Sequence, residues 1–217
     1  MNKVTIVDRK AELAQNEFEA LLHFAFPEKQ ERIKRLRSLH DAQNCLLADV
    51  LARVEICRAT GIRMSQLEFA VGDYGKPLLV NDPCVHFNVS HAGRYIACAV
   101  SDVPVGIDIE LIGSANMKIA ERFFTPDERA YIMAGGDRAY RFCEVWTKKE
   151  SRIKWEGKGL HMSLSSFSVL DDSANPEVFY HMAFCDGEAI CHMCSTDDSE
   201  PSVRLLGTNV LLEGVII

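Results

Sequence analysis

The feature that most restricts how this chain can fold is an order of elements that occurs twice: predicted helices, then short strands. In the first half, apolar residues recur at helical spacing from about His40 to Thr60, and Gly61 is placed to end that helix. Apart from a short opening strand near residues 4–7, the first strand-like runs cover residues 67–71, 85–90, 94–100 and 105–111.

The second half repeats this order. Helices are expected near residues 118–122, 126–134 and 138–155, and strands at 167–170, 177–184 and 189–194. The pattern predicts an α+β fold of two similar halves, residues 1–103 and 104–217, joined near Ser101–Pro104. No long linker separates the halves, so they should pack directly on each other. Their interface is then the natural place for a ligand cleft.

Composition and charge narrow the class of protein. Hydrophobic residues make up 47% and charged residues 25% of the 217, which is typical of a soluble globular protein. The start of the chain lacks the apolar core of a secretory signal, so we expect a cytoplasmic protein with no membrane span. A net charge of −7 argues against a general nucleic-acid binder. Basic residues nevertheless outnumber acids between Lys29 and Arg63, which would suit a small polyanionic ligand; solvated helix faces are the alternative.

Eight cysteines raise the question of disulfides or a metal site. Most lie in apolar runs, where a reduced cysteine acts as a small hydrophobic residue. The tightest group comprises Cys185, Cys191, His192 and Cys194. A zinc finger would show a second ligand pair at suitable spacing, and none is present, so a strand is the favoured interpretation.

Two acids lie two residues apart in the run VGIDIEL. On a strand, Asp108 and Glu110 point to the same face, and Ile107, Ile109 and Leu111 point to the other face, toward the core. Adjacent carboxylates repel unless a cation or a proton lies between them, and Mg²⁺ prefers such oxygen ligands. An exposed strand face with unconnected acids is the alternative.

A second cluster lies on the predicted helix that ends in EGKGL. Trp146, Glu150 and Lys154 occupy positions i, i+4 and i+8, along one face of that helix. Glu150 and Lys154 could form only a surface ion pair. They could also add a third carboxylate and an ammonium to a site for a metal-bound phosphate.

A third cluster, HFNVSHAG, ends a predicted strand. Ser90 and His91 cannot form a nucleophile–base pair by themselves, because adjacent strand residues face apart. Donation to a phosphate oxygen suits either side chain better, and a structural hydrogen bond is the alternative for His91. Together, the three clusters indicate Mg²⁺-assisted chemistry on a phosphate ester.

The motifs also occur in a recognisable order: GKP, FNVSHAG, GIDIE, FF and WTKKESRIKWEGKGL. In this order the chain resembles the 4′-phosphopantetheinyl transferases, specifically the long, monomeric, surfactin-synthetase-activating type, over roughly residues 25–170. The resemblance implies a pseudo-dimer of two α+β halves with coenzyme A in the cleft between them. It also implies transfer of the phosphopantetheine arm to a serine of an acyl or peptidyl carrier protein, with release of adenosine 3′,5′-bisphosphate.

The resemblance assigns roles by position. Three acids correspond to those that hold Mg²⁺ on the coenzyme A pyrophosphate: Asp108, Glu110 and Glu150. Six residues correspond to contacts of coenzyme A: Lys154 and His91 with phosphate oxygens, Ser90 and Lys76 along the nucleotide, and Lys29 and Arg32 with the 3′-phosphate. Catalysis would fall to Glu150, as the base for the carrier serine, and to Lys154. Trp146 would support the helix by packing.

The sequence leaves some points open. Asn44 stands where relatives often have arginine, which leaves the contacts to the 3′-phosphate or adenine unsettled. The region 111–124, with Met117, Phe123 and Phe124, could form part of the carrier-docking face, although the two phenylalanines could equally be core. A Mg²⁺-dependent phosphodiesterase or nuclease could use the same acids and lysine. A coenzyme A-binding or carrier-binding protein without catalysis is the non-enzymatic alternative.

Overall fold

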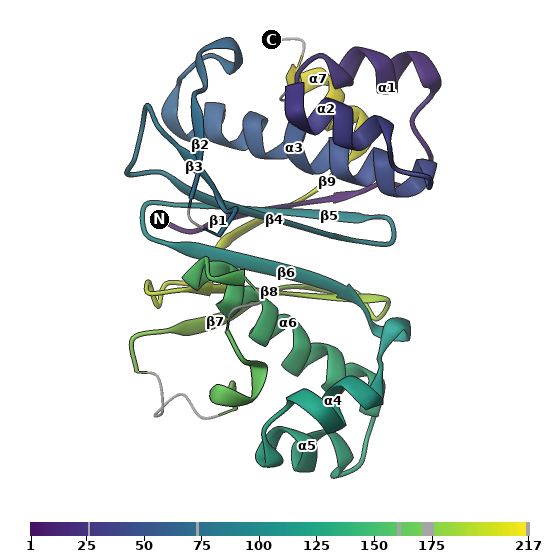
Figure 1. The fold of residues 1–217 in the computed structure, drawn as a ribbon, viewed down its shortest axis with the longest axis vertical. Helices are drawn as coiled ribbons and strands as arrows, with labels where there is room; N and C mark the ends of the chain where they lie inside the picture. The colour runs from purple at the N-terminus through teal and green to yellow at the C-terminus, as the bar shows by residue number, and fades with distance from the viewer. Residues whose placement is uncertain (26, 73, 160–161, 171–175, 216–217) are drawn as a thin grey trace.

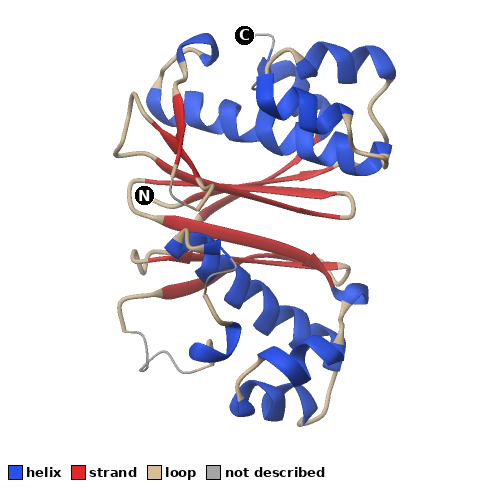
Figure 2. Cartoon of the chain, viewed as in Figure 1, coloured by secondary structure: helices blue, strands red, loops and turns tan. Residues whose placement is uncertain are grey.

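Two sheets lie face to face across the middle of the molecule, and helices cover the outer face of each sheet (Figures 1 and 2). The computed structural model describes residues 1–25, 27–72, 74–159, 162–170 and 176–215. The resulting order of layers is helices, sheet, sheet, helices. This two-half α+β architecture confirms the predicted fold class.

The first half is built around one long helix. α3 (Leu39–Thr60) begins at Ser38, whose hydroxyl accepts from the Asp41 amide, and ends at Gly61 with a φ of 74°. Both ends confirm the predicted helix. The other elements described before residue 104 are β1 (Lys3–Asp8), α1 (Gln15–Leu22), α2 (Pro27–Lys34), a short 3₁₀ helix (Met64–Gln66), β2 (Phe69–Val71), β3 (Pro77–Leu79), β4 (His86–Ala92) and β5 (Tyr95–Ser101). β4 forms one edge of the sheet ordered β4-β5-β1-β9, and β2 and β3 form a separate hairpin.

The second half places one long helix, α6 (Arg138–Glu156), against the sheet ordered β6-β8-β7. Its strands are β6 (Val105–Leu111), β7 (Phe179–Cys185) and β8 (Ala189–Ser195), and two short helices, α4 (Met117–Phe123) and α5 (Pro126–Met133), precede α6. The three predicted helices are therefore confirmed. Every residue of β8 is buried, because the first sheet covers one of its faces and α6 covers the other.

The end of the chain returns to the first half. β9 (Ser202–Gly207) pairs in parallel with β1, and α7 (Thr208–Val215) places Leu211 in the core around α3. The prediction that residues 104–217 form the second half therefore needs correction at its C-terminal end. A parallel pair between segments almost 200 residues apart leaves no local signal in the sequence.

The predicted strand at 167–170 is wrong. Residues 167–170 form no strand, although Phe167 and Val169 are buried, and a short 3₁₀ helix (Leu164–Ser166) precedes them. The Val169 amide donates to Glu128 rather than to a neighbouring strand. In this loop, alternate apolar residues are buried against the core that contains α6. The resulting alternation of apolar and polar residues resembles that of a strand.

The prediction that the apolar residues of β6 face the core is confirmed for Ile107 and Ile109, and Leu111 packs against the same core but is only partly buried. Ile107 and Ile109 are fully buried against Val4 and Ile6 of the first sheet. Cys191 belongs to this core, whereas its neighbour His192 faces α6 and shares a hydrogen bond with Thr147. A common zinc ion for these two residues is therefore excluded by the strand geometry. Among the helices described, none is both long and apolar enough to cross a membrane.

Candidate active site

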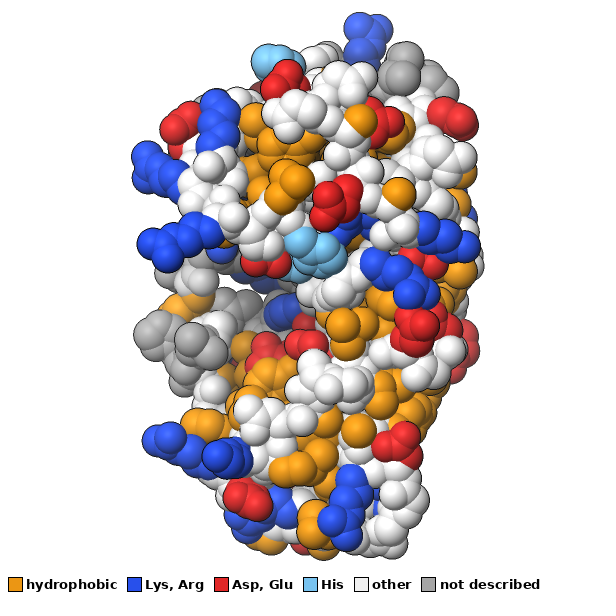
Figure 3. All heavy atoms as spheres, turned by 90° about the vertical axis from the view of Figure 1, so that its right-hand side faces the viewer, with side chains coloured by type: hydrophobic (Ala, Val, Ile, Leu, Met, Phe, Trp, Pro, Cys, Tyr) orange, Lys and Arg blue, Asp and Glu red, His pale blue; other side chains and the backbone are white. Residues whose placement is uncertain are grey.

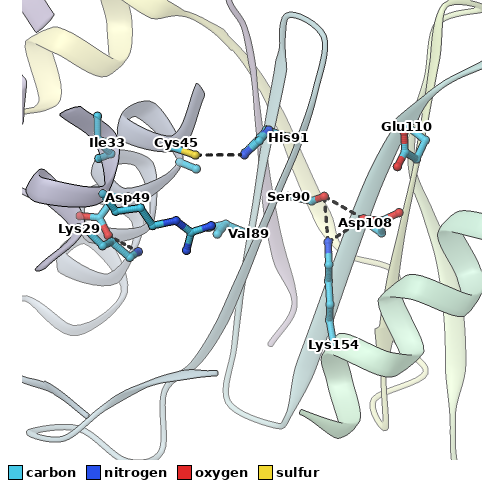
Figure 4. A pocket seen from close by; sticks show the side chains of 12 residues that line it. Lys29, Ile33, Cys45, Asp49, Val89, Ser90, His91, Asp108, Glu110 and Lys154 are labelled. Atoms are coloured by element: carbon cyan, nitrogen blue, oxygen red, sulfur yellow. Dashed lines mark hydrogen bonds and ion pairs between the residues drawn. The ribbon is translucent and has the colours of Figure 1, made fainter. Parts of the chain in front are cut away.

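A pocket of about 410 Å³ lies between the two halves. Helices α2 and α3 form one wall, β4 lies in the middle, and β6 and α6 form the other wall (Figure 4). Figure 3 shows a hollow between the halves with basic, acidic and histidine side chains around it. Most of the residues predicted for the site line this pocket together: Lys29, Arg32, Ser90, His91, Asp108, Glu110 and Lys154.

Asp108 is the centre of the polar contacts. The residue is 4% exposed, and Oδ1 accepts from Lys154 Nζ at 2.6 Å and from Ser90 Oγ at 2.9 Å. Its other oxygen, Oδ2, is buried and has no hydrogen-bond partner within the described residues. A buried carboxylate oxygen without a donor is costly, so this atom is suited to a cation or to a donor from a ligand.

Glu110 and Glu150 are both close enough to Asp108 to feel its charge. Burial, and then the Asp108 carboxylate, raise the pKa of Glu110, while Trp146 Nε1 donates to Glu110 at 3.3 Å. Burial and the same neighbour raise the pKa of Glu150 to about 7. Asp108, Glu110 and Glu150 therefore repel one another when all three are ionised, and the Lys154 ammonium, which bonds to Asp108, balances only part of that negative charge.

The three acids do not surround a common point in this structure. Within the residues that are described, no three His, Cys, Asp or Glu side chains are grouped as ligands of a metal ion. Glu150 instead lines a neighbouring pocket of about 310 Å³, together with Lys154 and Gly157. The donor set still fits a hard divalent cation, because it offers carboxylate oxygens, and one of these is buried without a partner in the described part of the chain.

The close approach of α6 to β6 brings these groups together. A Cβ on Gly106 would lie 2.0 Å from the Ser151 carbonyl oxygen and 2.4 Å from the Trp155 nitrogen. Only glycine allows this contact between the backbones of strand and helix. The motif GIDIE was identified by its two acids. Its glycine, Gly106, allows the close approach of α6 that brings Lys154 within reach of Asp108.

Ser90 and His91 face opposite sides of β4, as predicted. Ser90 points to Asp108 and Lys154, and His91 points toward α3, with Nε2 3.8 Å from Cys45 Sγ (Figure 4). Burial, and then the nearby Lys154 ammonium, lower the pKa of His91. Because β4 is an edge strand, both faces are open to the same pocket.

On the wall of the pocket formed by α2 and α3, the basic side chains, Lys29 and Arg32, belong to α2, and α3 contributes Asp49. Lys29 Nζ lies 2.5 Å from Asp49, which also accepts from Arg53. Asn44 does not belong to this wall: it is 2% exposed and is held between Arg9 and the Gly93 carbonyl. Asn44, where relatives often have arginine, therefore belongs to a buried hydrogen-bond network and not to the pocket. The next residue, Cys45, lines the pocket, and the sequence analysis did not identify it as a site residue.

An apolar pocket of about 580 Å³ adjoins the charged one and shares Lys29 and Val89 with it. Phe69 on β2 and Phe87 on β4 contribute aromatic rings that meet edge to face. No pattern in the sequence indicated this pocket, because the β2–β3 hairpin that covers it pairs only with itself.

Lys76 is placed differently from the other predicted contacts. Its ammonium donates to the backbone carbonyls of Val105, Lys154 and Trp155, at 3.0, 2.6 and 3.3 Å. It therefore lies behind the Lys154 end of α6 rather than in the charged pocket. Lys76 lines the smaller pocket that contains Glu150, and its two chain neighbours line the apolar pocket.

In the region 111–124, which was expected to dock a carrier protein, some side chains are buried and others are exposed. Phe124 is 3% exposed and stacks on Phe142 and Trp146, so it is core, as the alternative held. Phe123 is 41% exposed, and Met117 is partly buried against the core of the second half. Packing of Trp146 in this aromatic stack agrees with its expected role in supporting α6.

Comparisons with known proteins agree with this arrangement. A family model described as "4′-phosphopantetheinyl transferase, N-terminal" matches residues 12–103, and one described as "4′-phosphopantetheinyl transferase superfamily" matches residues 104–205. The two models meet where the chain passes from β5 to β6.

Three relatives illustrate the similarity. The 4′-phosphopantetheinyl transferase Sfp of Bacillus subtilis is 42% identical over 72% of this chain and 71% of its own length. A second 4′-phosphopantetheinyl transferase of Bacillus subtilis is 36% identical over 87% of this chain and 84% of its own. The L-aminoadipate-semialdehyde dehydrogenase-phosphopantetheinyl transferase of Saccharomyces cerevisiae is 28% identical over 92% and 74%. The chain belongs to the 4′-phosphopantetheinyl transferase family and is of the Sfp type.

Proposed function

We propose that this protein transfers the 4′-phosphopantetheine group of coenzyme A to a serine hydroxyl of an acyl or peptidyl carrier protein, with Mg²⁺ as cofactor. Adenosine 3′,5′-bisphosphate is the second product. The observation that carries the proposal is the set of three carboxylates, Asp108, Glu110 and Glu150, beside Lys154 and a basic pocket, in a chain of this family. The protein acts in the cytoplasm. It acts as a monomer, since its own two halves supply both walls of the cleft.

The two adjoining pockets suit the two ends of a nucleotide. Lys29, Arg32 and His91 line the charged pocket, where ammonium, guanidinium and imidazole groups can donate to phosphate oxygens. The apolar pocket with Phe69 and Phe87 suits the adenine base, which favours contact with aromatic and aliphatic side chains. Their shared boundary at Lys29 allows one ligand to occupy both.

Asp108, Glu110 and Glu150 would hold the magnesium ion. Bound there, Mg²⁺ would neutralise charge on the pyrophosphate and act as a Lewis acid. Lys154 already balances part of the Asp108 charge through its 2.6 Å contact, and it can also donate to a phosphate oxygen. Ser90 holds both groups in position, because its hydroxyl accepts from Lys154 and donates to Asp108.

Glu150 is the candidate base for the serine proton. A serine hydroxyl is a poor nucleophile at neutral pH, so a nearby group must accept its proton. In the metal-free protein, burial and the neighbouring carboxylates raise the pKa of Glu150 to about 7. A cation bound to this carboxylate would lower that pKa and make it a weaker base, so the roles of base and of metal ligand compete at Glu150. The same side chain lines the neighbouring pocket, whose walls come from both halves of the chain, and is accessible from there.

The carrier would dock near α4, which follows the strand of the acids. Exposed Phe123 and partly buried Met117 offer apolar contact, and such contact must carry much of the docking because this protein has a net charge of −7 and carrier domains are acidic. Charge substitution at Met117 is expected to weaken carrier binding while coenzyme A binding is kept. Unchanged carrier affinity in that variant would remove Met117 from the docking face.

The reaction is tested by intact-mass spectrometry of an apo carrier protein incubated with this protein, coenzyme A and Mg²⁺, with EDTA as the control. We expect a mass gain of one phosphopantetheine arm that EDTA abolishes. A gain that persists in EDTA would refute the metal requirement. Consumption of coenzyme A without any transfer to the carrier would favour a phosphodiesterase, and no gain with a panel of acyl and peptidyl carriers would refute the transfer activity.

A further inference from the structure

Lys76 has an unusual set of partners for a lysine beside an active site. All three hydrogen bonds that it makes within the described structure go to backbone carbonyls, those of Val105, Lys154 and Trp155. Two of these carbonyls belong to the last turn of α6, which ends at Glu156. Carbonyls in a last turn lack helical partners and carry the negative end of the helix dipole, so an ammonium there is well compensated.

These contacts connect three parts of the site. Lys76 directly precedes β3 and follows Gly75, which lines the apolar pocket. Val105 is the first residue of β6, three positions before Asp108. The Lys154 carbonyl belongs to the residue whose ammonium binds Asp108. One side chain therefore joins the hairpin of the apolar pocket, the strand of the acids and the helix of Lys154.

The surroundings of Lys76 hold its side chain in this position. A Cβ on Gly157, the residue that caps α6 with a φ of 70°, would lie 3.3 Å from Lys76 Cδ, so the stem of the lysine packs on the helix end. Burial lowers the pKa of Lys76 to about 8, in agreement with an ammonium enclosed by protein. Next to it, strand β6 and helix α6 touch through Gly106. Strand and helix are therefore fixed at two neighbouring points.

We propose that Lys76 is a positioning residue, which fixes the end of α6 against β6 and the β2–β3 hairpin so that Lys154 and Glu150 are aligned with the nucleotide pocket. The inference rests on the proposed function. It differs from the role implied by the resemblance, in which Lys76 lines the nucleotide, because its three carbonyl contacts place the ammonium behind α6. Nucleotide binding is then assigned to the basic side chains of the charged pocket on α2 and β4.

The two roles predict different changes in kinetics. If Lys76 bound the nucleotide equally in the ground state and in the transition state, its removal would raise KM and leave kcat unchanged. Loss of alignment lowers kcat with coenzyme A affinity kept, and a misplacement of about 1 Å can cost on the order of 100-fold in rate. The backbone amides of the last turn of α6 should also exchange faster with solvent when Lys76 no longer holds that turn.

The experiment compares Lys76→Met with Lys158→Met, and measures coenzyme A binding by titration, kcat for carrier modification, and amide hydrogen exchange of residues 153–156. Lys158 is a matched control, because it lies just beyond the end of α6 and its ammonium donates to the Glu156 side chain rather than to the helix backbone. For Lys76→Met we expect kcat to fall at least about tenfold, with the Kd for coenzyme A changed by less than about threefold and faster exchange at 153–156. Lys158→Met should match the wild type in all three.

Lys76→Arg provides rescue and a second variant if the methionine does not fold. Its guanidinium can donate to the same carbonyls, so kcat should recover in part with an unchanged Kd. A Kd raised about tenfold with kcat and exchange unchanged, in either variant, would overturn the inference. Unchanged exchange together with unchanged kcat would do the same. Exchange is measured without turnover, so a wild type that transfers nothing would refute the proposed function and still leave the contact of Lys76 with α6 open to test.

Discussion

Removal of the Lys149 ammonium should destabilise this protein severely, because that ammonium belongs to an ion pair enclosed in the second half. Lys149 and Glu128 are both 0% exposed, and Lys149 Nζ lies 2.9 Å from Glu128 Oε1. Lys149 also donates to the carbonyls of Leu164 and Phe167, both at 2.6 Å. Glu128 in turn accepts from the Val169 amide. The pair therefore joins α5, α6 and the loop after α6.

The magnitude follows from what each substitution leaves behind. Lys149→Met fits the same space with a thioether, but it leaves the Glu128 carboxylate buried without a counter-charge and two carbonyls without a donor. Breaking a buried pair in this way costs about 3–5 kcal/mol. Since a domain is stabilised by only about 5–15 kcal/mol, this loss is a large part of the total. In the double variant Lys149→Met, Glu128→Gln, no buried charge remains, so much of the loss should be recovered.

Urea denaturation followed by the fluorescence of Trp146 and Trp155 measures these changes, because both side chains lie on α6. Lys148→Met is the matched control: it removes the neighbouring lysine, whose ion pair with Glu144 is only partly buried, and should cost less than about 1 kcal/mol. The reasoning is refuted by a Lys149→Met variant within about 1 kcal/mol of the wild type, or by a double variant that loses the sum of the two single changes.

Three further changes test the site and its support. Gly106→Ala should cost about 1–3 kcal/mol or more in urea denaturation and lower the transfer rate, because its Cβ would lie 2.0 Å from the Ser151 carbonyl oxygen; an unchanged midpoint would contradict this contact. Glu150→Gln should leave coenzyme A binding largely intact and remove most turnover, whereas equal loss of both would assign Glu150 to metal binding alone. Burial lowers the pKa of His192 from 6.5 to about 3, so between these two pH values the imidazole is protonated in the unfolded chain and neutral in the folded protein. Stability should therefore be highest above pH 6.5 and fall by about 1.4 kcal/mol per pH unit between pH 6.5 and 3 from this group, and His192→Gln should flatten that slope in urea titrations at several pH values.

The parts of the fold that could be predicted from the sequence are those with a local cause. The helix that became α3 has apolar residues at helical spacing and a glycine at its end, and both are found in the structure. Alternation predicted β6, and it placed Ile107 and Ile109 in the core and both acids on the opposite face. The resemblance added the grouping of Ser90, Asp108 and Lys154 from three separate elements, which spacing alone cannot give.

The errors arose where the cause lies far along the chain. β9 is a strand because β1 offers it a free edge, and the order of the sheet cannot be read from residues 202–207. Asn44 stands out in the sequence as a change in the pocket, but Arg9, 35 residues earlier, draws it into a buried network. The assignment of Lys76 to the nucleotide stays a prediction, but the contacts of its ammonium with carbonyls almost 80 residues away could not be predicted from the sequence.

Three consecutive residues of α6 show why charge in a sequence does not reveal its role. Lys148 pairs with Glu144 near the surface, Lys149 is fully buried against Glu128, and Glu150 feels the Asp108 charge, with its pKa raised to about 7 by burial and by that neighbour. In a helix, successive side chains are separated by about 100°, so each of the three meets a different environment. The periodicity that placed Trp146, Glu150 and Lys154 on one face was sufficient for the site, but it could not distinguish a buried lysine from an exposed one. Only the acid on the neighbouring helix α5 makes that distinction, because it permits Lys149 to be buried with its charge.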